Sequence, residues 1–209
     1  MHTWIVLIRG INVGGRVLPM KRLVELMETA GCTDVRTYIQ SGNAVCRTRS
    51  SDATALAQKI GKAILASEGS EPKVMILSRE ELAAAATANP YPTTAPKAVH
   101  LFFLSGTHTP DAMAAVEAVR VPTEHYTLGP STLYFYTPAG FGPSKLAAKF
   151  EKLAKVDATA RNWNTVQTLL DLAAAYDAGD APKAAPKPAP ARRVRKPAAA
   201  RVTAKQRRR

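Results

Sequence analysis

WIVLIRGINVGGRVLPMKRLVELM, residues 4–27, is the stretch around which the predicted fold is arranged. It begins with a near-continuous apolar run, which is typical of a strand buried on both faces. A glycine-rich turn follows at residues 9–15. Pro19 then precedes apolar residues at positions 20, 23, 24 and 27, which is the spacing of one helix face. The stretch therefore predicts a strand, a turn and an amphipathic helix.

The same order of elements is predicted twice along the chain. After the first helix, residues 35–40 and 44–48 have the composition of strands on either side of a hairpin turn. A helix capped by Asp52, a strand and a short helix complete a first half, residues 1–88. Residues 89–96 are a proline-rich connector. Residues 97–177 then repeat the order and end in a helix that Asn164 or Thr165 is expected to cap.

This order predicts an α+β fold, an α/β sandwich of two ferredoxin-like β-α-β-β-α-β repeats with trailing helices. Each half is expected to form an antiparallel sheet with helices on one face. Right-handed crossovers then place the glycine-rich turn and the hairpin turn, residues 40–43, at the same edge of one sheet. Spare backbone amides and a helix N-terminus attract negative charge, so this edge is a candidate site for a small anionic ligand.

Two alternatives to a ligand site remain open. The glycines at positions 10, 14 and 15 match neither the dinucleotide fingerprint nor the phosphate-binding loop, and they could serve only a tight turn. Trp163 could stack on an aromatic ligand, or it could pack in the core while its neighbouring asparagines cap backbone groups. The candidate ligand-binding residues are Arg9, Gly10, Asn12, Gly14, Gly15, Gln40, Ser41, Asn43, Arg161, Asn162, Trp163 and Asn164.

Catalytic and metal-binding patterns are not found. Cys32 and Cys46 form no C-x-x-C pair, and the four histidines are scattered, so no metal site is predicted. Cys46 is expected to be a small core residue. No catalytic residue or cofactor can be assigned, and enzyme activity stays open. The β-α-β-β-α-β order is also that of RNA-recognition domains, for which Tyr134 and Tyr136 would have to present their rings to bases.

The positive charge is concentrated at the C-terminus. The chain has 29 Lys and Arg against 16 Asp and Glu, a net charge of +13. Residues 1–180 carry all the acids and a net charge of only +2. The eleven other cations are Lys183, Lys187, Arg192, Arg193, Arg195, Lys196, Arg201, Lys205, Arg207, Arg208 and Arg209.

Residues 181–209 consist almost entirely of Lys, Arg, Ala and Pro, and they lack aromatic residues. Such a segment buries too little apolar surface to fold, so a disordered tail is predicted. Its composition is similar to that of the tails of linker-histone-like bacterial proteins. The charge predicts non-specific binding to DNA or RNA, and the alternative is a tail that only aids solubility.

Three segments, residues 7–15, 38–43 and 161–166, together resemble a bacterial family known as domain of unknown function 1697. The resemblance covers about residues 1–177. It implies a globular α/β body made of two related halves, and no established activity, cofactor or catalytic residue. No signal segment or membrane-spanning apolar run is found, which predicts a cytoplasmic protein without a membrane partner, associated with the nucleoid if the tail binds DNA.

Overall fold

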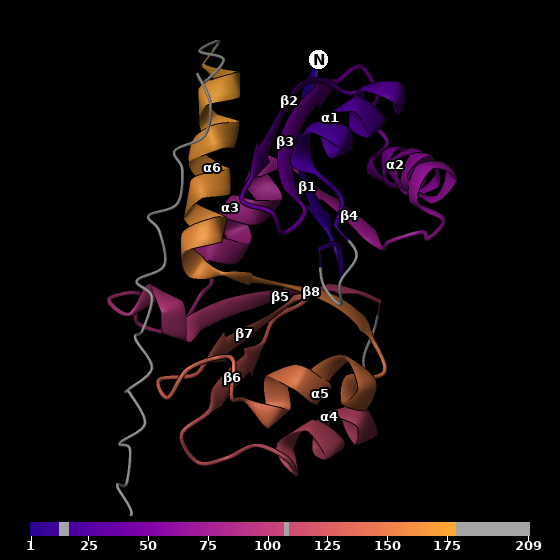
Figure 1. Cartoon of the computed structure of the whole chain (residues 1–209). Coiled ribbons are helices and arrows are strands. Elements are labelled where there is room, and N and C mark those ends of the chain that lie inside the picture. The colour runs from indigo at the N-terminus through magenta and orange to yellow at the C-terminus, as the bar shows by residue number, and fades with distance from the viewer. Residues whose placement is uncertain (13–16, 107–108, 179–209) are drawn as a thin grey trace, which may run out of the picture.

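Figure 1 presents the structure, a computed structural model that describes residues 1–12, 17–106 and 109–178. The described residues form two four-stranded antiparallel sheets and six α-helices, so the α+β class predicted from the sequence is confirmed. Gly14, Gly15 and the basic tail lie outside the described residues.

The first sheet has the strand order β2-β3-β1-β4, with β1 between β3 and β4. Val6 of β1 lies opposite Ala44 of β3 and Ile76 of β4, and both pairings are antiparallel. The elements of this half are β1 (His2–Ile8), α1 (Met20–Thr29), β2 (Thr33–Tyr38), β3 (Asn43–Thr48), α2 (Ala53–Glu68), β4 (Val74–Leu77) and α3 (Arg79–Thr87).

The second sheet has the strand order β6-β7-β5-β8, and β5 takes the position that β1 has in the first sheet. Phe102 of β5 lies opposite Leu133 of β7 and Ala160 of β8. The elements are the 3-10 turn η1 (Pro96–Ala98), β5 (Val99–Ser105), α4 (Pro110–Glu117), β6 (His125–Leu128), β7 (Thr132–Tyr136), α5 (Lys145–Ala154), β8 (Asp157–Asn162) and α6 (Trp163–Asp177).

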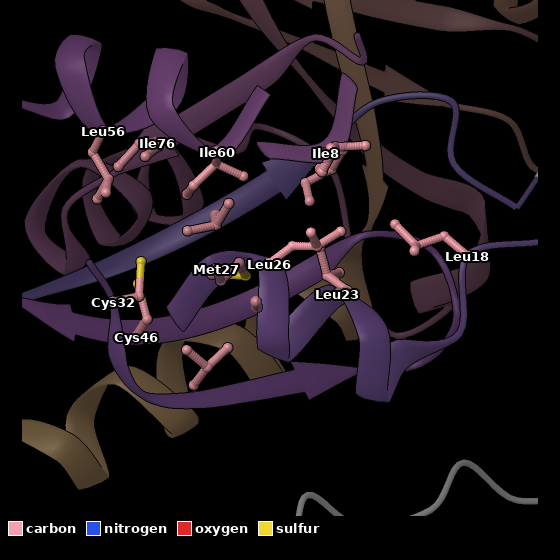
Figure 2. Packing of buried hydrophobic residues seen from close by; sticks show 14 residues of the cluster. Ile8, Leu18, Leu23, Leu26, Met27, Cys32, Cys46, Leu56, Ile60 and Ile76 are labelled. Carbon is pink, nitrogen blue, oxygen red and sulfur yellow. The ribbon is translucent and has the colours of Figure 1, made fainter. Parts of the chain in front are cut away.

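Three apolar clusters hold these layers together. The first lies between the first sheet and the helices α1 and α2 (Figure 2). A second cluster lies between the second sheet and α5, with Val116 of α4 included. The third joins the inner faces of both sheets to α3 and α6, which stand beside the first sheet in Figure 1.

The packing of strand β1 explains why its sequence is almost continuously apolar. Val6 and Ile8 pack under α1 and α2, whereas Ile5 and Leu7 belong to the cluster between the sheets. The strand is therefore buried on both faces, as predicted. Each sheet was expected to carry helices on one face only, and this expectation is incomplete. The inner faces of the two sheets are also covered, by one apolar cluster that spans both halves.

Most helix starts follow from local capping. Asp52 caps α2, as predicted, by accepting a hydrogen bond from the Ala55 amide, and Ser78 forms a capping box with Glu81 at the start of α3. The predicted start of α6 is wrong by two or three residues, because Asn164 or Thr165 was expected to be the cap. Asn162 caps this helix, because its side-chain oxygen accepts a hydrogen bond from the Asn164 amide, and α6 begins at Trp163.

The C-terminal end of α6 is fastened to the first half. Arg47 of β3 donates a hydrogen bond to the Tyr176 carbonyl, and the Tyr176 hydroxyl donates one to the Asp34 carbonyl. Arg79 of α3 forms an ion pair with Asp177, at 2.8 Å. The last described helix therefore ends at a defined position on the first half, and residues 181–209 begin shortly after it.

His100 makes the stability of the second half depend on pH. Its ring is buried in β5 and stacks on Phe141, with the ring centroids 3.7 Å apart. Its Nδ1 atom has no hydrogen-bond partner in the described part of the chain. Burial therefore lowers the pKa of His100 to about 4, because the charged form is poorly solvated there.

Acid is expected to destabilise the protein through His100. His100 takes up a proton near pH 6.5 in the unfolded chain and only near pH 4 in the folded chain. The contribution of neutral His100 to the unfolding free energy is therefore complete above pH 6.5 and is lost as the pH falls from 6.5 to 4. Between pH 7.5 and 4.5 the protein should lose about 2.5 kcal/mol more unfolding free energy than a His100→Leu variant. Urea unfolding at both pH values measures this difference, and equal losses would contradict the assignment.

Candidate functional site

Two turns that are distant in sequence meet at one end of the first sheet. The Ile8 amide, at the end of β1, donates a hydrogen bond to the Gly42 carbonyl at 2.7 Å. Gly42 has a φ of +74°, and a Cβ atom there would lie 2.6 Å from the Ile8 carbonyl oxygen. Only glycine permits this approach. Residues 9–12 and 40–43 of the candidate ligand site are therefore neighbours, and we call this region the turn edge.

Asn12 connects the two turns of the turn edge. It has a φ of +60°, which asparagine tolerates better than most residues. Its Oδ1 atom accepts a hydrogen bond from the Leu18 amide at 2.6 Å. Its Nδ2 atom donates to the carbonyls of Leu18 and Gln40, at 3.1 and 2.9 Å. The polar atoms of Asn12 are thus engaged in holding the first turn and the start of α1 against the hairpin.

Arg161 of β8 reaches from the second half into the turn edge. Its Nε atom donates to Oδ1 of the fully buried Asn43. Its Nη2 atom donates to the Ile8 carbonyl at 2.9 Å and to the Ser41 carbonyl at 3.3 Å, and Nη1 donates to the Ala160 carbonyl at 2.8 Å. A single guanidinium group therefore joins β1, the hairpin and β8.

The acceptors around the charged Arg161 guanidinium are uncharged oxygen atoms. No ion pair joins it to a carboxylate within residues 1–12, 17–106 and 109–178. Burial lowers the pKa of Arg161 to about 10, so the guanidinium is still charged at neutral pH. Four oxygen acceptors surround the cation and compensate part of the lost hydration.

Arg9 is engaged differently, in an ion-pair network between the two halves. It contacts Glu151 of α5 and lies 3.4 Å from Asp157 of β8. Lys73, which precedes β4, lies 3.2 Å from the other oxygen of Asp157. Glu151 also accepts a hydrogen bond from the Ala158 amide at 2.9 Å. The positive charge of Arg9 is therefore offset by two carboxylates, which weakens its attraction for an added anion.

Residues 161–164 span the junction between strand β8 and helix α6. Asn162 caps α6 with its oxygen and donates from Nδ2 to the Pro96 carbonyl at 3.0 Å. Trp163 is half-buried and packs against the cluster between the sheets, and Asn164 is exposed. Arg161 thus reaches the turn edge, whereas the described contacts of Asn162, Trp163 and Asn164 lie at the start of α6.

A hollow of about 590 Å³ opens beside the first turn. Arg9 and Asn12 line one part of it, Leu18 lines another, and Glu68 and Glu71 add two carboxylates. Its volume lies within the range of small-molecule sites. The mixed charge of the lining suits a polar ligand and gives no strong preference for anions.

The aromatic faces that an RNA-recognition domain would need are covered. Tyr134 is 4% exposed and packs between the sheets, and Phe102 is equally buried on the other face of β5. Tyr136 stacks on Tyr91 of the connector, with their centroids 5.5 Å apart. Tyr134 and Phe102 are therefore closed to bases, whereas Tyr136 is partly exposed with its ring stacked on Tyr91.

Sequence reasoning missed the ion-pair network around Arg9. Its partners Glu151 and Asp157, and the Lys73 that pairs with Asp157, lie far from Arg9 in sequence and belong to no recognisable motif. A carboxylate that ends up beside a cation across two halves leaves no local signal, so only the folded chain reveals it. Gly10 does lie in the turn with a φ of +71°, as a tight turn requires.

Within the described residues, no three side chains of His, Cys, Asp or Glu are grouped so that they could hold a metal ion. None of the described helices combines the length and the apolar composition needed to cross a bilayer.

Comparison with known proteins gives a family and a fold. A family described as "Protein of unknown function (DUF1697)" matches residues 1–134. No curated protein matches the sequence. Among solved structures, the chain is similar to a conserved bacterial protein, SP0830, from Streptococcus pneumoniae, with a TM-score of 0.62 and 24% identity. The similarity covers 82% of this chain and 98% of that one, and it concerns the fold alone.

Proposed function

This chain belongs to the family of proteins of unknown function described as DUF1697. We propose that it binds DNA or RNA without sequence preference through residues 181–209, which lie outside the part that matches the family. The uneven distribution of charge carries this proposal. Eleven Lys and Arg and no acid follow residue 180, whereas the preceding 180 residues have a net charge of only +2. A run of cations without acids is attracted to the phosphates of any nucleic acid.

The ion pairs of the folded part also favour the tail as the segment that binds nucleic acid. Arg22 pairs with Glu25, Arg79 with Asp177 and Arg120 with Glu117, in addition to the network around Arg9. These cations have carboxylates close by, so the folded part has a weaker attraction for a polyanion than the tail has. The engaged polar groups of Asn12, Asn43 and Arg161 favour a structural role for the turn edge.

Removal of the tail tests the proposal. A protein that ends at Asp180 is expected to bind duplex DNA at least 100-fold more weakly than the full chain at low salt, because nearly all the excess positive charge is gone. Fluorescence anisotropy with two unrelated duplexes and one single strand measures the affinities. Equal binding by both proteins would overturn the proposal. If the proposal holds, the protein in the cell is expected to be found with the nucleoid.

We infer in addition that each half is a ferredoxin-like unit, residues 1–88 and 97–177, and that residues 89–96 connect them. The matching strand orders β2-β3-β1-β4 and β6-β7-β5-β8 support this inference, as do the α-helices, which are the second, fifth and seventh elements of each half when η1 is left out. The two units share the apolar cluster between the sheets, which supports a repeat of topology within one folded body. Superposition of the Cα atoms of the two halves tests the repeat.

The rival proposal is an enzyme or a small-molecule binder with its site at the turn edge. The hollow of about 590 Å³ at Arg9 and Asn12 supports it. In this case inorganic phosphate at ten times its Kd should raise the Tm of the protein that ends at Asp180 by about 3 °C, and Arg9→Ala should abolish the rise.

The matched control for this phosphate test is Lys73→Ala. Lys73 also pairs with Asp157, but it does not line the hollow, so this variant should keep its response to phosphate. Each variant is compared with itself in the absence of phosphate, because loss of an ion pair can shift the Tm directly. An unchanged Tm in the parent protein would count against an anion site at the turn edge.

A further inference from the structure

Two buried thiols lie side by side in the first half. Cys32 follows the C-terminal end of α1 and stands directly before β2, and Cys46 lies in β3. Their Sγ atoms are 3.5 Å apart. Both side chains belong to the cluster under α1 and α2, where Figure 2 shows them together. Because a disulfide bond is about 2.0 Å long, the sulfurs need to approach by only about 1.5 Å to form one.

The strand next to Cys32 is irregularly paired. The pairing of β2 with β3 changes register between Thr33 and Arg36, and Asp34 within this irregularity has a φ of +53°. A bulge interrupts the regular ladder of hydrogen bonds. The sulfur of Cys32 can therefore shift toward Cys46 without breaking a continuous run of strand pairing.

The two thiols differ in reactivity. The Cys46 thiol donates a hydrogen bond to the Cys32 sulfur. This bond lowers the pKa of Cys32, because it stabilises the thiolate, and the same contact raises the pKa of Cys46. Since the thiolate is the reactive form, Cys32 is the nucleophile of the pair and Cys46 is the resolving thiol.

Cys32 is also the thiol closer to the surface. It is 3% exposed, whereas Cys46 is fully buried. A hollow of about 580 Å³ is lined by residues on both sides of Cys32 in sequence, including Gly31 and Thr33, and by the cations Arg49 and Lys59. A small neutral oxidant can enter such a hollow, whereas a large one meets the closed packing over the sulfur.

We propose that Cys32 and Cys46 are a modification site at which a small hydroperoxide forms a reversible intramolecular disulfide. The Cys32 thiolate attacks one oxygen of hydrogen peroxide, the O–O bond breaks, and the other oxygen leaves as hydroxide and takes up a proton to become water. Cys32 is then a sulfenic acid. The Cys46 sulfur attacks the Cys32 sulfur, the S–O bond breaks, and the departing hydroxide takes up the Cys46 proton. Two thiols lose two electrons, and one peroxide is reduced to two waters.

The bond closes the loop formed by residues 32–46, which contains β2 and the hairpin turn with Gln40, Ser41 and Asn43. Closure of a loop of this length restricts the unfolded chain. Oxidation therefore stabilises the half of the protein that forms the turn edge. The inference is independent of nucleic-acid binding by the tail, since neither thiol depends on residues 181–209.

The test uses the full chain, reduced with dithiothreitol, desalted and exposed to hydrogen peroxide at neutral pH. The expected result is the loss of two hydrogen atoms from the intact mass, a peptide that joins Cys32 to Cys46 after digestion, and a Tm that rises by roughly 5 °C. Dithiothreitol should reverse all three changes. A protein that keeps both thiols, or whose cysteines join two separate chains, would overturn the proposal.

Single variants distinguish the two roles. Cys46→Ser has no resolving thiol but keeps a hydroxyl donor beside Cys32, so it should stop at one added oxygen on Cys32. Cys32→Ala should stay unchanged during the same exposure, because the remaining thiol is fully buried and burial by itself still raises the pKa of Cys46. The opposite pattern, with oxygen added to Cys46 alone, would reverse the assignment of the nucleophile. The mass of the oxidised parent protein decides the main proposal even if a variant folds poorly.

Discussion

The affinity of the full chain for duplex DNA is expected to fall about 1,000-fold between 50 and 200 mM monovalent salt. Each Lys or Arg that contacts a phosphate releases roughly 0.9 counterion, so about six engaged cations give a slope of log K against log[salt] near −5. The eleven cations after residue 180 provide more than this number. The measurement is a salt titration of binding with the full chain and with the protein that ends at Asp180.

Two variants of equal length separate charge from other properties of the tail. Replacement of its eleven Lys and Arg by Gln should remove binding, as truncation does, because the phosphates lose their partners. Replacement of the tail arginines by Lys keeps the charge and should keep both the affinity and the slope within a factor of a few. Affinity for unrelated duplexes should be similar, since phosphate contacts do not report sequence.

Several results would contradict tail binding. A slope near zero would mean that phosphate contacts do not provide the affinity. Strong discrimination between duplexes of different sequence would require side chains held against base edges, which the proposal does not include. Undiminished binding by the truncated protein would direct attention to the folded part, beginning with the turn edge.

Arg161→Met is expected to destabilise the protein by about 3 kcal/mol, the largest effect of any single substitution at the turn edge. The Ile8 and Ser41 carbonyls and the Asn43 side-chain oxygen would each lose a charged donor. Methionine fills much of the space but donates no hydrogen bond. A fall in Tm of about 10 °C is the corresponding change for a protein of this size. Urea unfolding of the protein that ends at Asp180 measures it.

The control for Arg161 is an exposed arginine in the same protein. Arg49→Met removes the same charge at the surface and should change the unfolding free energy by less than about 0.5 kcal/mol. A double-mutant cycle with Asn43→Ala should give a coupling of about 1 kcal/mol or more, because the two side chains contact each other directly. Additive effects of Arg161 and Asn43 would mean that the contact contributes little to stability.

The secondary structure was largely predictable because its signals are local. The capping box of Ser78, the cap at Asp52 and the left-handed Gly69 after α2 each act within a few residues. The start of α6 was misplaced because three of the residues at positions 162–165 can cap a helix. Only the contact of Asn162 with both the Asn164 amide and the Pro96 carbonyl decides between them.

The sequence by itself determined the α+β class, the family, the concentration of positive charge after residue 180 and the apolar strand β1, because composition and short-range spacing suffice for these. Tertiary structure alone decided what the polar residues do. It placed Arg9 next to Glu151 and Asp157, Arg161 next to Asn43 and the Ile8 carbonyl, and Cys32 next to Cys46. The first two contacts join residues that are more than 100 positions apart, and the third depends on an irregular strand pairing. The first two contacts arise only when the two sheets close over a shared apolar cluster, which no local pattern encodes.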